Sequence, residues 1–200
     1  MKLEDKQSLV FIGDSITDCG RTEEPEGLGG GYVRMIRDYL HVSRPAWTPR
    51  WYNRGVSGET IVDLRARWEE DVIALQPDVL TVSIGINDEW KQVPLAEYRR
   101  LYEELLTETR QATGAALVLM ETTIISEDPE DGKNARLTPY NEAIREIAAR
   151  YDAVLVPQNR CFESYLRQQQ GKTLTYDQVH MNSTGNWLIA RNWLEACGAL

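Results

Sequence analysis

The sequence contains few of the residues that build disulfide frameworks and metal centres. Its 200 residues include three cysteines, Cys19, Cys161 and Cys197, with no CxxC spacing among them. An odd number of widely spaced cysteines argues against a disulfide framework and against a zinc knuckle. There are two histidines, His41 and His180, and no HExxH pattern, so the sequence offers no histidine-rich metal site and we expect no bound metal.

Long apolar runs and an excess of positive charge are also missing. The N-terminal stretch MKLEDKQSLVFIGDS mixes charges of both signs with an apolar run too short for a signal peptide or a membrane span. The 22 Lys and Arg residues face 31 Asp and Glu residues, and the formal net charge of −9 repels nucleic-acid backbones and anionic lipid surfaces. We therefore expect a cytoplasmic protein whose partners include neither nucleic acid nor a membrane.

The sequence does contain an alternation of apolar strands and amphipathic helices. Its length fits a single domain, 1–200, because no repeat, linker or low-complexity segment divides it. Most strands are nearly continuous hydrophobic runs, typical of strands covered on both faces. The alternation predicts an α/β fold, a three-layer α/β/α sandwich around a parallel sheet with right-handed crossovers. Predicted strands cover 8–13, 50–55 (weaker), 78–85, 116–123 and 153–158, and predicted helices cover 30–41, 60–76, 94–113, 138–151 and 183–196.

Four unusual stretches fall at the predicted strand ends or in the last loop. They are Gly13-Asp14-Ser15, NRGVSGET at 53–60, GINDEW at 85–90 and YDQVHMN at 176–182. Because ligands of parallel α/β sheets bind beyond the carboxyl ends of the strands, we expect these stretches to meet in one site. The loop 126–136, rich in charge and in helix breakers, is long enough to form a rim over that site.

Ser15 is the candidate nucleophile of this site. A serine hydroxyl needs a base to take its proton, and imidazole is the usual base near neutral pH. His180 is the better candidate, because His41 falls at the end of a predicted helix and is expected at the surface. Asp177 lies three residues before His180, a spacing at which a carboxylate in a tight loop can accept a hydrogen bond from the ring and fix its tautomer. The alternative is that Asp177 caps a turn and His180 is a solvated loop residue.

Acyl transfer also needs donors for the oxyanion that forms when a serine attacks a carbonyl. Asn87 follows a buried strand, so its amide is expected at the strand end. Gly58 allows a close backbone approach and can offer its N–H, since glycine lacks a Cβ atom. The N–H of Ser15 is the third candidate donor. Taken singly, Asn87 and Gly58 have a simpler explanation, because both residue types are common in turns.

Taken together, the stretches GDSITD, NRGVSGET, GIND and DQVH resemble the SGNH hydrolases, also called the GDSL esterases and lipases. In that family serine, glycine, asparagine and histidine come from four blocks in this order, and the resemblance spans residues 11–190. It implies Ser15 as nucleophile, His180 as base and Asp177 as its orienting acid. It also implies Gly58 and Asn87 as oxyanion donors beside the Ser15 N–H, a five-stranded flavodoxin-like sheet, and no metal or organic cofactor.

The longer stretches GDSITDCGR, DLRARWEEDVI and GINDEW are most similar to the intracellular acetylxylan esterases, which remove acetyl groups from sugars. The resemblance implies a serine esterase that releases short acyl groups, in particular acetyl, from a small-molecule ester such as an acetylated sugar, through an acyl-enzyme. Asp14, Trp90 and Tyr176 flank the expected site and are predicted to contact the substrate. An aromatic face there stacks on a sugar ring or closes the acyl pocket, whereas the alternative is that both aromatic residues only pack the loops. Trp47 and Trp51 flank the second predicted strand and are expected in the core.

One residue departs from the family pattern. Met181 stands where proline usually follows the histidine, so we expect a less rigid loop before the last helix. The sequence also lacks the GxSxG nucleophile elbow, which argues against an α/β-hydrolase fold.

Other functions stay open. The same machinery serves short-chain carboxylesterases, thioesterases and lysophospholipases. A non-catalytic carbohydrate-binding module on this fold is expected to lack Ser15, Asn87 or His180, and all three are present. A nucleotide or flavin binder needs a loop that cradles phosphate, whereas GDSITD brings two aspartates, and GxGxxG and Walker patterns are missing. The oligomeric state, including a homo-oligomer, also stays open.

Overall fold

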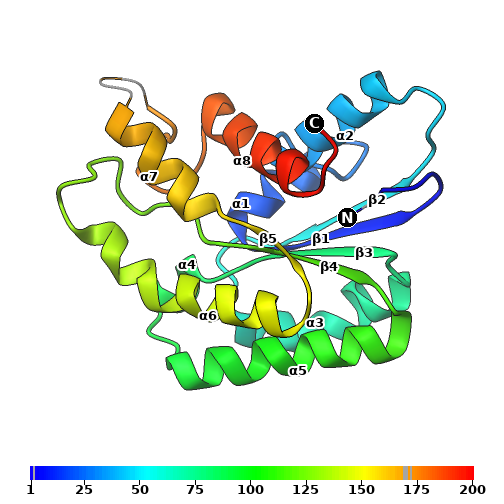
Figure 1. Cartoon of the computed structure of the whole chain (residues 1–200), viewed down its shortest axis with the longest axis horizontal. Coiled ribbons are helices and arrows are strands. Elements are labelled where there is room, and N and C mark those ends of the chain that lie inside the picture. Colours follow the sequence, from blue (N-terminus) through cyan, green and yellow to red (C-terminus); the bar gives the residue numbers. More distant parts are fainter. Residues whose placement is uncertain (2, 169–170, 172) are drawn as a thin grey trace.

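The structure, a computed structural model that describes residues 1, 3–168, 171 and 173–200, contains a five-stranded parallel sheet between two layers of helices (Figure 1). The strands pair in the order β2-β1-β3-β4-β5, and all pairs are parallel. This is the flavodoxin-like order, in which the winding direction reverses between β1 and β3. The predicted α/β/α sandwich is therefore confirmed. The strands are Ser8–Gly13 (β1), Arg50–Gly55 (β2), Val79–Ser83 (β3), Ala116–Met120 (β4) and Val154–Val156 (β5).

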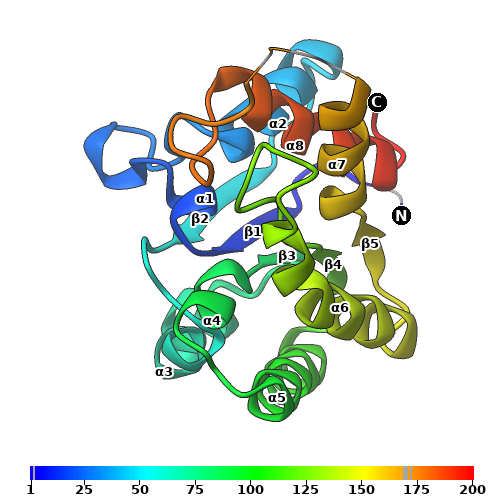
Figure 2. The ribbon, with the colours of Figure 1, turned by 90° about the vertical axis from the view of Figure 1, so that its left-hand side faces the viewer.

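Helices cover both faces of the sheet. In Figure 1, α2, α7 and α8 lie above the sheet, and α3, α5 and α6 lie below it. Figure 2 looks onto the carboxyl ends of the strands, where the orange segment before α8 lies beside α1. The helices are Ser15–Asp18 (α1), Tyr32–Ser43 (α2), Ile61–Asp71 (α3), Ile86–Trp90 (α4), Leu95–Thr113 (α5), Thr138–Arg150 (α6), Gln158–Gln168 (α7) and Ser183–Ala196 (α8).

The apolar strands hold the two helical layers together. Successive residues of a strand point to opposite faces of the sheet, so a continuous apolar run contributes side chains to the hydrophobic core on each face. In β1, Leu9 and Phe11 join the cluster made with α2 and α8, whereas Val10 and Ile12 join the cluster made with α3, α5 and α6. Each such side chain that is fully buried stabilises the fold by about 1.5–3 kcal/mol.

Helix α3 begins where the sequence predicts. Asp63 Oδ2 accepts hydrogen bonds from the backbone N–H and the hydroxyl of Thr60, both at 2.8 Å, and the Thr60 side chain caps the helix in return. The inner face buries Trp68, whose indole N–H donates to Thr109 on α5 at 3.0 Å. The predicted helix over 60–76 ends at Asp71 and continues as a 3₁₀ turn at Ile73–Leu75.

The structure differs from the sequence prediction mainly at α7. The predicted strand 153–158 ends at Val156, and α7 starts two residues later. Phe162 and Leu166 are buried on one face of this helix, and the Gln158 side chain donates to the carbonyl of Ile189 on α8 at 3.2 Å. Apart from these two residues and the partly buried Tyr165, the helix is mostly polar, so its sequence carries only a weak helical period.

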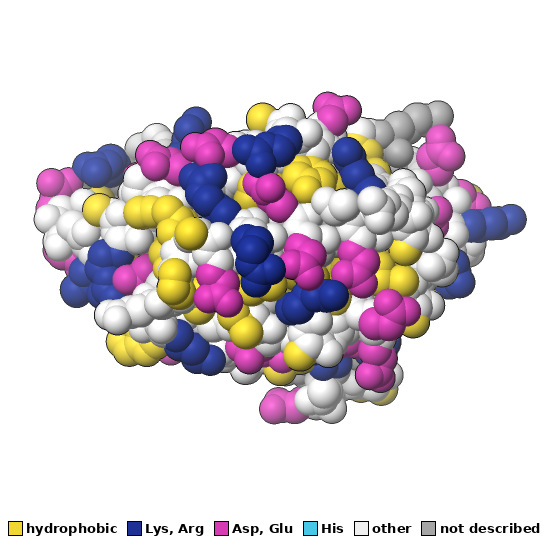
Figure 3. Space-filling model, turned by 90° about the horizontal axis from the view of Figure 1, so that it is seen from below, with side chains coloured by type: hydrophobic (Ala, Val, Ile, Leu, Met, Phe, Trp, Pro, Cys, Tyr) yellow, Lys and Arg dark blue, Asp and Glu magenta, His cyan; other side chains and the backbone are white. Residues whose placement is uncertain are grey.

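The outer surface of α3 and α5 carries charges of both signs (Figure 3). Arg65 on α3 pairs with Glu104 and Glu108 on α5, and Arg100 pairs with Glu104. Exposed pairs of this kind contribute only about 0–1 kcal/mol each, so they add little to the stability of the fold. None of the described helices is long and apolar enough to cross a membrane.

Candidate active site

The site is built at the point where the strand order reverses. β1 ends at Gly13, and the chain turns directly into α1, whose first residue is Ser15. A side chain at position 13 would overlap the carbonyl oxygen of Ser83 at the end of β3, so only glycine allows β1 and β3 to approach here. β3 leads into α4, which carries Asn87. The four sequence stretches therefore meet beyond the carboxyl ends of neighbouring strands, as expected.

Ser15, His180 and Asp177 form a series of hydrogen bonds. His180 Nε2 lies 3.1 Å from Ser15 Oγ, and His180 Nδ1 lies 2.7 Å from Asp177 Oδ2. The other oxygen of Asp177 accepts from the backbone N–H groups of His180 at 2.7 Å and Val179 at 3.1 Å. The hydrogen bond from the ring, followed by the one from the His180 backbone, lowers the pKa of Asp177 to about 2. A permanent carboxylate holds the proton on Nδ1 and leaves Nε2 to accept a proton from Ser15.

Backbone hydrogen bonds between its own residues restrain the loop that carries His180. The N–H of Tyr176 donates to the carbonyl of His180 at 2.8 Å, and Thr175 and Met181 form an antiparallel bridge. Met181 is only 5% exposed, and its carbonyl accepts from the side chain of Asn186 at 3.1 Å. Packing and backbone pairing thus restrain the position where the family usually has proline. The lower rigidity of this loop stays a prediction.

Gly58, in the loop after β2, and Asn87, in helix α4, lie on segments that are bonded to each other. Asn87 Nδ2 donates to the carbonyl of Glu59 at 2.9 Å, which leaves its second amide hydrogen available. Gly58 has φ +82°, a backbone conformation that favours glycine. Among the residues that the structure describes, nothing accepts a hydrogen bond from the N–H of Gly58 or of Ser15. Three amide groups can therefore donate to an oxygen bound at this place.

Two cavities meet at Ser15, Ile16 and His180. One, of about 280 Å³, is walled by apolar side chains and by residues of the loop predicted as a rim: Ile86, Asn87, Trp90, Ile125, Lys133, Arg136 and Val179. The other, of about 260 Å³, is lined by Cys19, Gly20, Ser57, Tyr176, Met181 and Asn186. An ester whose carbonyl lies at Ser15 has separate spaces for its acyl and alcohol parts.

The three residues predicted to contact substrate differ in exposure. Trp90 is 72% exposed and Tyr176 is 79% exposed, and each lines a different cavity, so both side chains are open to a bound ligand. Asp14 also borders the larger cavity but is 3% exposed, and its Oδ1 caps α1 by accepting from the N–H of Ile16 at 3.0 Å. Burial raises the pKa of Asp14 to about 6. Its main contact is therefore the helix that carries Ser15.

Lys133 and Arg136 were not singled out in the sequence, although their loop was. Lys133 pairs with Asp131 at 2.9 Å, and Arg136 pairs with Glu89 at 2.6 Å. The signal in the sequence was weak, because two cations in a loop of mixed charge are usually solvated. Their position over Ser15 depends on how the loop after β4 folds across the end of the sheet.

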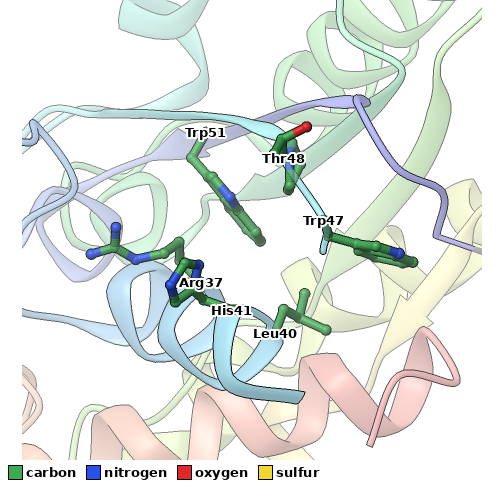
Figure 4. Close-up of a pocket in the computed structure, with 7 residues that line it drawn as sticks. Arg37, Leu40, His41, Trp47, Thr48 and Trp51 are labelled. Carbon is green, nitrogen blue, oxygen red and sulfur yellow. The ribbon is translucent and has the colours of Figure 1, made fainter. Parts of the chain in front are cut away.

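A third cavity, of about 250 Å³, lies at the opposite end of β2, away from the candidate site (Figure 4). It is lined by Arg37, Leu40, His41, Trp47, Thr48, Pro49 and Trp51. Trp51 stacks on Phe11 of the core, with ring centroids 6.1 Å apart, but both tryptophans are only half-buried. Their expected core position is thus partly right, and His41 is exposed as predicted.

The three cysteines are free, as their spacing predicts. Burial raises the pKa of the Cys197 thiol to about 12, so it stays protonated near neutral pH and the nucleophilic thiolate is scarce. Over the part of the chain that the structure describes, no group of three or more His, Cys, Asp or Glu side chains is placed to hold a metal ion.

A serine, an imidazole and a carboxylate bonded in series beside free amide donors define a site suited to attack on an ester carbonyl. The chain belongs to the GDSL-like Lipase/Acylhydrolase family, the SGNH hydrolases, whose sequence model matches residues 11–188. It is a carboxylic ester hydrolase of that family.

Relatives match nearly the whole chain. An acetylxylan esterase of Geobacillus stearothermophilus is 36% identical over 214 residues, which cover 99% of this chain and 97% of the relative. The crystal structure of Axe2, an acetylxylan esterase from the same organism, has a TM-score of 0.90 at 34% identity and covers 99% of this chain and 97% of Axe2. The crystal structure of LAE5, an alpha/beta hydrolase enzyme from the metagenome of Lake Arreo, Spain, has a TM-score of 0.91 at 34% identity, with 99% and 98% covered. The predicted family is confirmed.

Proposed function

We propose that this esterase removes acetyl groups from carbohydrates and that Ser15, His180 and Asp177 are its catalytic residues. The observation that carries the proposal is the bonded series from Ser15 Oγ through His180 to Asp177, placed where two cavities meet. Solved structures of Axe2 include catalytic mutants in which a serine, an aspartate or a histidine is replaced by alanine. The aspartate of Axe2 precedes its histidine by three positions, the spacing of Asp177 and His180.

The first half of the proposed reaction transfers the acyl group to the enzyme. Ser15 Oγ attacks the carbonyl carbon of the ester while His180 Nε2 takes the hydroxyl proton, and Asp177 stabilises the imidazolium that forms. The oxyanion accepts hydrogen bonds from the N–H groups of Ser15 and Gly58 and from Asn87 Nδ2. The intermediate then breaks its bond to the alcohol oxygen, which receives the proton from His180.

The second half releases the acid. His180 takes a proton from water, the hydroxyl attacks the acyl carbonyl, and the same three donors hold the second oxyanion. When this intermediate collapses, the bond to Ser15 Oγ breaks and the proton returns to it. The products are the free carboxylic acid and the enzyme in its starting state.

Three observations support an acetylated sugar as the substrate. The acetylxylan esterase relative covers almost the whole chain, so the loops that form the cavities are included in the match. Trp90 and Tyr176 offer exposed aromatic faces, which suit the apolar face of a sugar ring. The two cations on the rim, Lys133 and Arg136, are paired with carboxylates, so the wall favours an uncharged ligand.

The acyl preference tests this proposal. We expect kcat/KM to fall steeply from acetate to butyrate to octanoate esters, because each methylene that does not fit costs roughly 1–3 kcal/mol. Peracetylated xylose and xylobiose should be deacetylated, as followed by acetate release. A preference for octanoate would instead support the lipase or thioesterase alternative.

Replacing Trp90 separates sugar recognition from ester chemistry. If its ring is the sugar platform, Trp90→Ala should reduce kcat/KM for acetylated xylobiose by at least about tenfold more than for a small aryl acetate. Trp187→Ala is the matched control, because Trp187 is also exposed (43%) and lines neither cavity at Ser15. Equal losses on both substrates would show that Trp90 only packs the loop.

Replacing Asn87 tests the proposed oxyanion hole. Asn87→Ala should lower kcat by ~10²–10³ with little change in KM, the loss typical of one oxyanion donor. The measurement is steady-state hydrolysis of an aryl acetate, together with the melting temperature. An unchanged kcat with a lowered melting temperature would make Asn87 a turn residue only.

A further inference from the structure

The carboxyl group of Asp88 lies beside the proposed oxyanion hole and has no part in the reaction described above. Asp88 follows Asn87 on α4 and is fully buried, at 0% exposure. Its Oδ1 accepts from the backbone N–H of Ile61 at 2.9 Å. Its Oδ2 is also buried, and no group within the described part of the chain forms a hydrogen bond with it. A buried carboxyl group with one free oxygen is costly to retain, which points to a role for the contact it makes.

The contact joins the two segments that carry the oxyanion donors Asn87 and Gly58, namely helix α4 and the loop after β2. Ile61 is the first residue of α3 and ends the short segment that starts at Gly58. The carbonyl of Glu59, in the same segment, accepts from Asn87 Nδ2 at 2.9 Å. Consecutive residues of α4, Asn87 and Asp88, therefore bind the segment 58–61 at two points.

We propose that Asp88 is a positioning residue that sets the spacing between the Asn87 amide and the Gly58 N–H. Lys91, at the end of α4, adds a third bond from its Nζ to the carbonyl of Gly58 at 2.7 Å, but this bond is made by a long, exposed side chain. The bonds of Asn87 and Asp88 are made by short, neighbouring side chains, so together they fix the distance and the orientation of α4 relative to the segment 58–61. Oxyanion donors act only when they lie within hydrogen-bond distance of one oxygen, and a misplacement of about 1 Å can reduce the rate about 100-fold. Asp88 thus acts through the donors and does not touch the substrate.

The surroundings also shift the side chain of Asp88 toward its protonated form. Burial, reinforced by the nearby charge of Asp14, raises the pKa of Asp88 to about 7, although the bond from Ile61 opposes the shift. Both forms are therefore present near neutral pH, and the protonated form, with its proton on the oxygen that accepts no bond, adds no negative charge behind a developing oxyanion. Asparagine has the same shape, is neutral and keeps an oxygen for the Ile61 N–H, so it should replace Asp88.

A double-mutant cycle tests the inference. We expect Asp88→Ala to lower kcat for an aryl acetate about 10- to 100-fold with KM changed less than about threefold, and Asp88→Asn to keep kcat within about threefold of the starting protein. In the Asn87→Ala background, Asp88→Ala should lower kcat by no more than about threefold, because the spacing that it sets no longer matters.

Thr60→Ala is the matched control. Thr60 caps the same end of α3, and its hydroxyl bonds with Asp63 on α3 itself. This variant should lower the melting temperature, as the loss of a helix cap does, yet keep kcat within about threefold. A loss of kcat equal to that of Asp88→Ala would mean that any weakening of the α3 start harms the site, which contradicts a specific role for Asp88.

The other possible results for the Asp88 variants also decide whether Asp88 positions the donors. Unchanged kcat in Asp88→Ala, or the same fold-loss with and without Asn87, overturns the inference. If circular dichroism shows that Asp88→Ala does not fold, Asp88→Asn decides alone. A loss of kcat above about tenfold in Asp88→Asn, with an unchanged melting temperature, then overturns the inference.

The inference rests on the proposed role of Asn87. If Asn87→Ala alone leaves kcat unchanged, the oxyanion assignment fails, whereas a large Asn87 effect with no Asp88 effect refutes only this inference.

Discussion

Ser15→Ala is expected to lower kcat for an aryl acetate on the order of 10⁶-fold, the scale observed when a serine nucleophile is removed. The residue has no substitute, because acylation needs an oxygen at the point where the two cavities meet. The fold should be unaffected, because the cap of α1 comes from Asp14, which accepts from the N–H of Ile16. Within the described part of the chain, the hydroxyl of Ser15 is bonded only to His180. The melting temperature should therefore stay close to that of the starting protein.

A serine-directed organophosphorus reagent gives the direct readout. Mass spectrometry should find one adduct, on the peptide that contains Ser15, and none in the alanine variant. Ser43→Ala, at the exposed end of α2, is a suitable control and should keep both the adduct and the activity. An adduct on a different serine, with activity lost in parallel, would refute the assignment.

Asp177→Asn is expected to lower kcat about 10³- to 10⁴-fold, although the loop keeps its shape. The oxygen that accepts from the backbone N–H groups of Val179 and His180 is retained in asparagine. The oxygen that faces His180 Nδ1 is replaced by the amide NH₂ group, which donates a hydrogen bond to Nδ1. The imidazole then carries its proton on Nε2, toward Ser15, and cannot accept the hydroxyl proton.

The same substitution decides between the two interpretations of Asp177. Asparagine caps turns about as well as aspartate, so a residue that only caps this loop should tolerate the change with little loss. Asp128→Asn is the matched control, since Asp128 Oδ1 accepts from the N–H of Glu130 at 2.9 Å in an exposed turn. Nearly normal kcat in Asp177→Asn would show that the carboxylate does not orient His180 for catalysis.

Sequence reasoning was most accurate where local spacing carries the information. Strands β1 and β2 and helix α8 have the predicted bounds, and Thr60 and Asp63 cap α3 as predicted. A period of two or of 3.6 residues, a capping pair and a glycine before a turn depend on neighbours within a few positions. The order of the four stretches and the strand ends that carry them also predict that Ser15, Asn87 and His180 converge.

Where a helix has few apolar positions, the sequence pattern was insufficient. In α7 the buried face consists mainly of Phe162 and Leu166, and its helical state depends on packing against α8. Trp47 and Trp51 are expected in the core because they flank the second predicted strand, yet they are half-buried and border a cavity at the edge of the sheet. In both cases the burial of a side chain is decided by a distant segment.

The sequence by itself determined the family, the sheet of alternating strands and helices, and the identity of the candidate site residues, because these properties are encoded in short stretches. Tertiary structure alone decided the contacts between stretches. His180 meets Ser15 across 165 positions, and Asp88 meets Ile61 across 27. It also decided that Asp14 and Asp88 are buried with raised pKa values, that Trp90 and Tyr176 face different cavities, and that Arg136 and Lys133 border the site. The physical reason is that desolvation, hydrogen bonding and cavity shape depend on which atoms from several elements surround a group, and that is settled only when the elements pack.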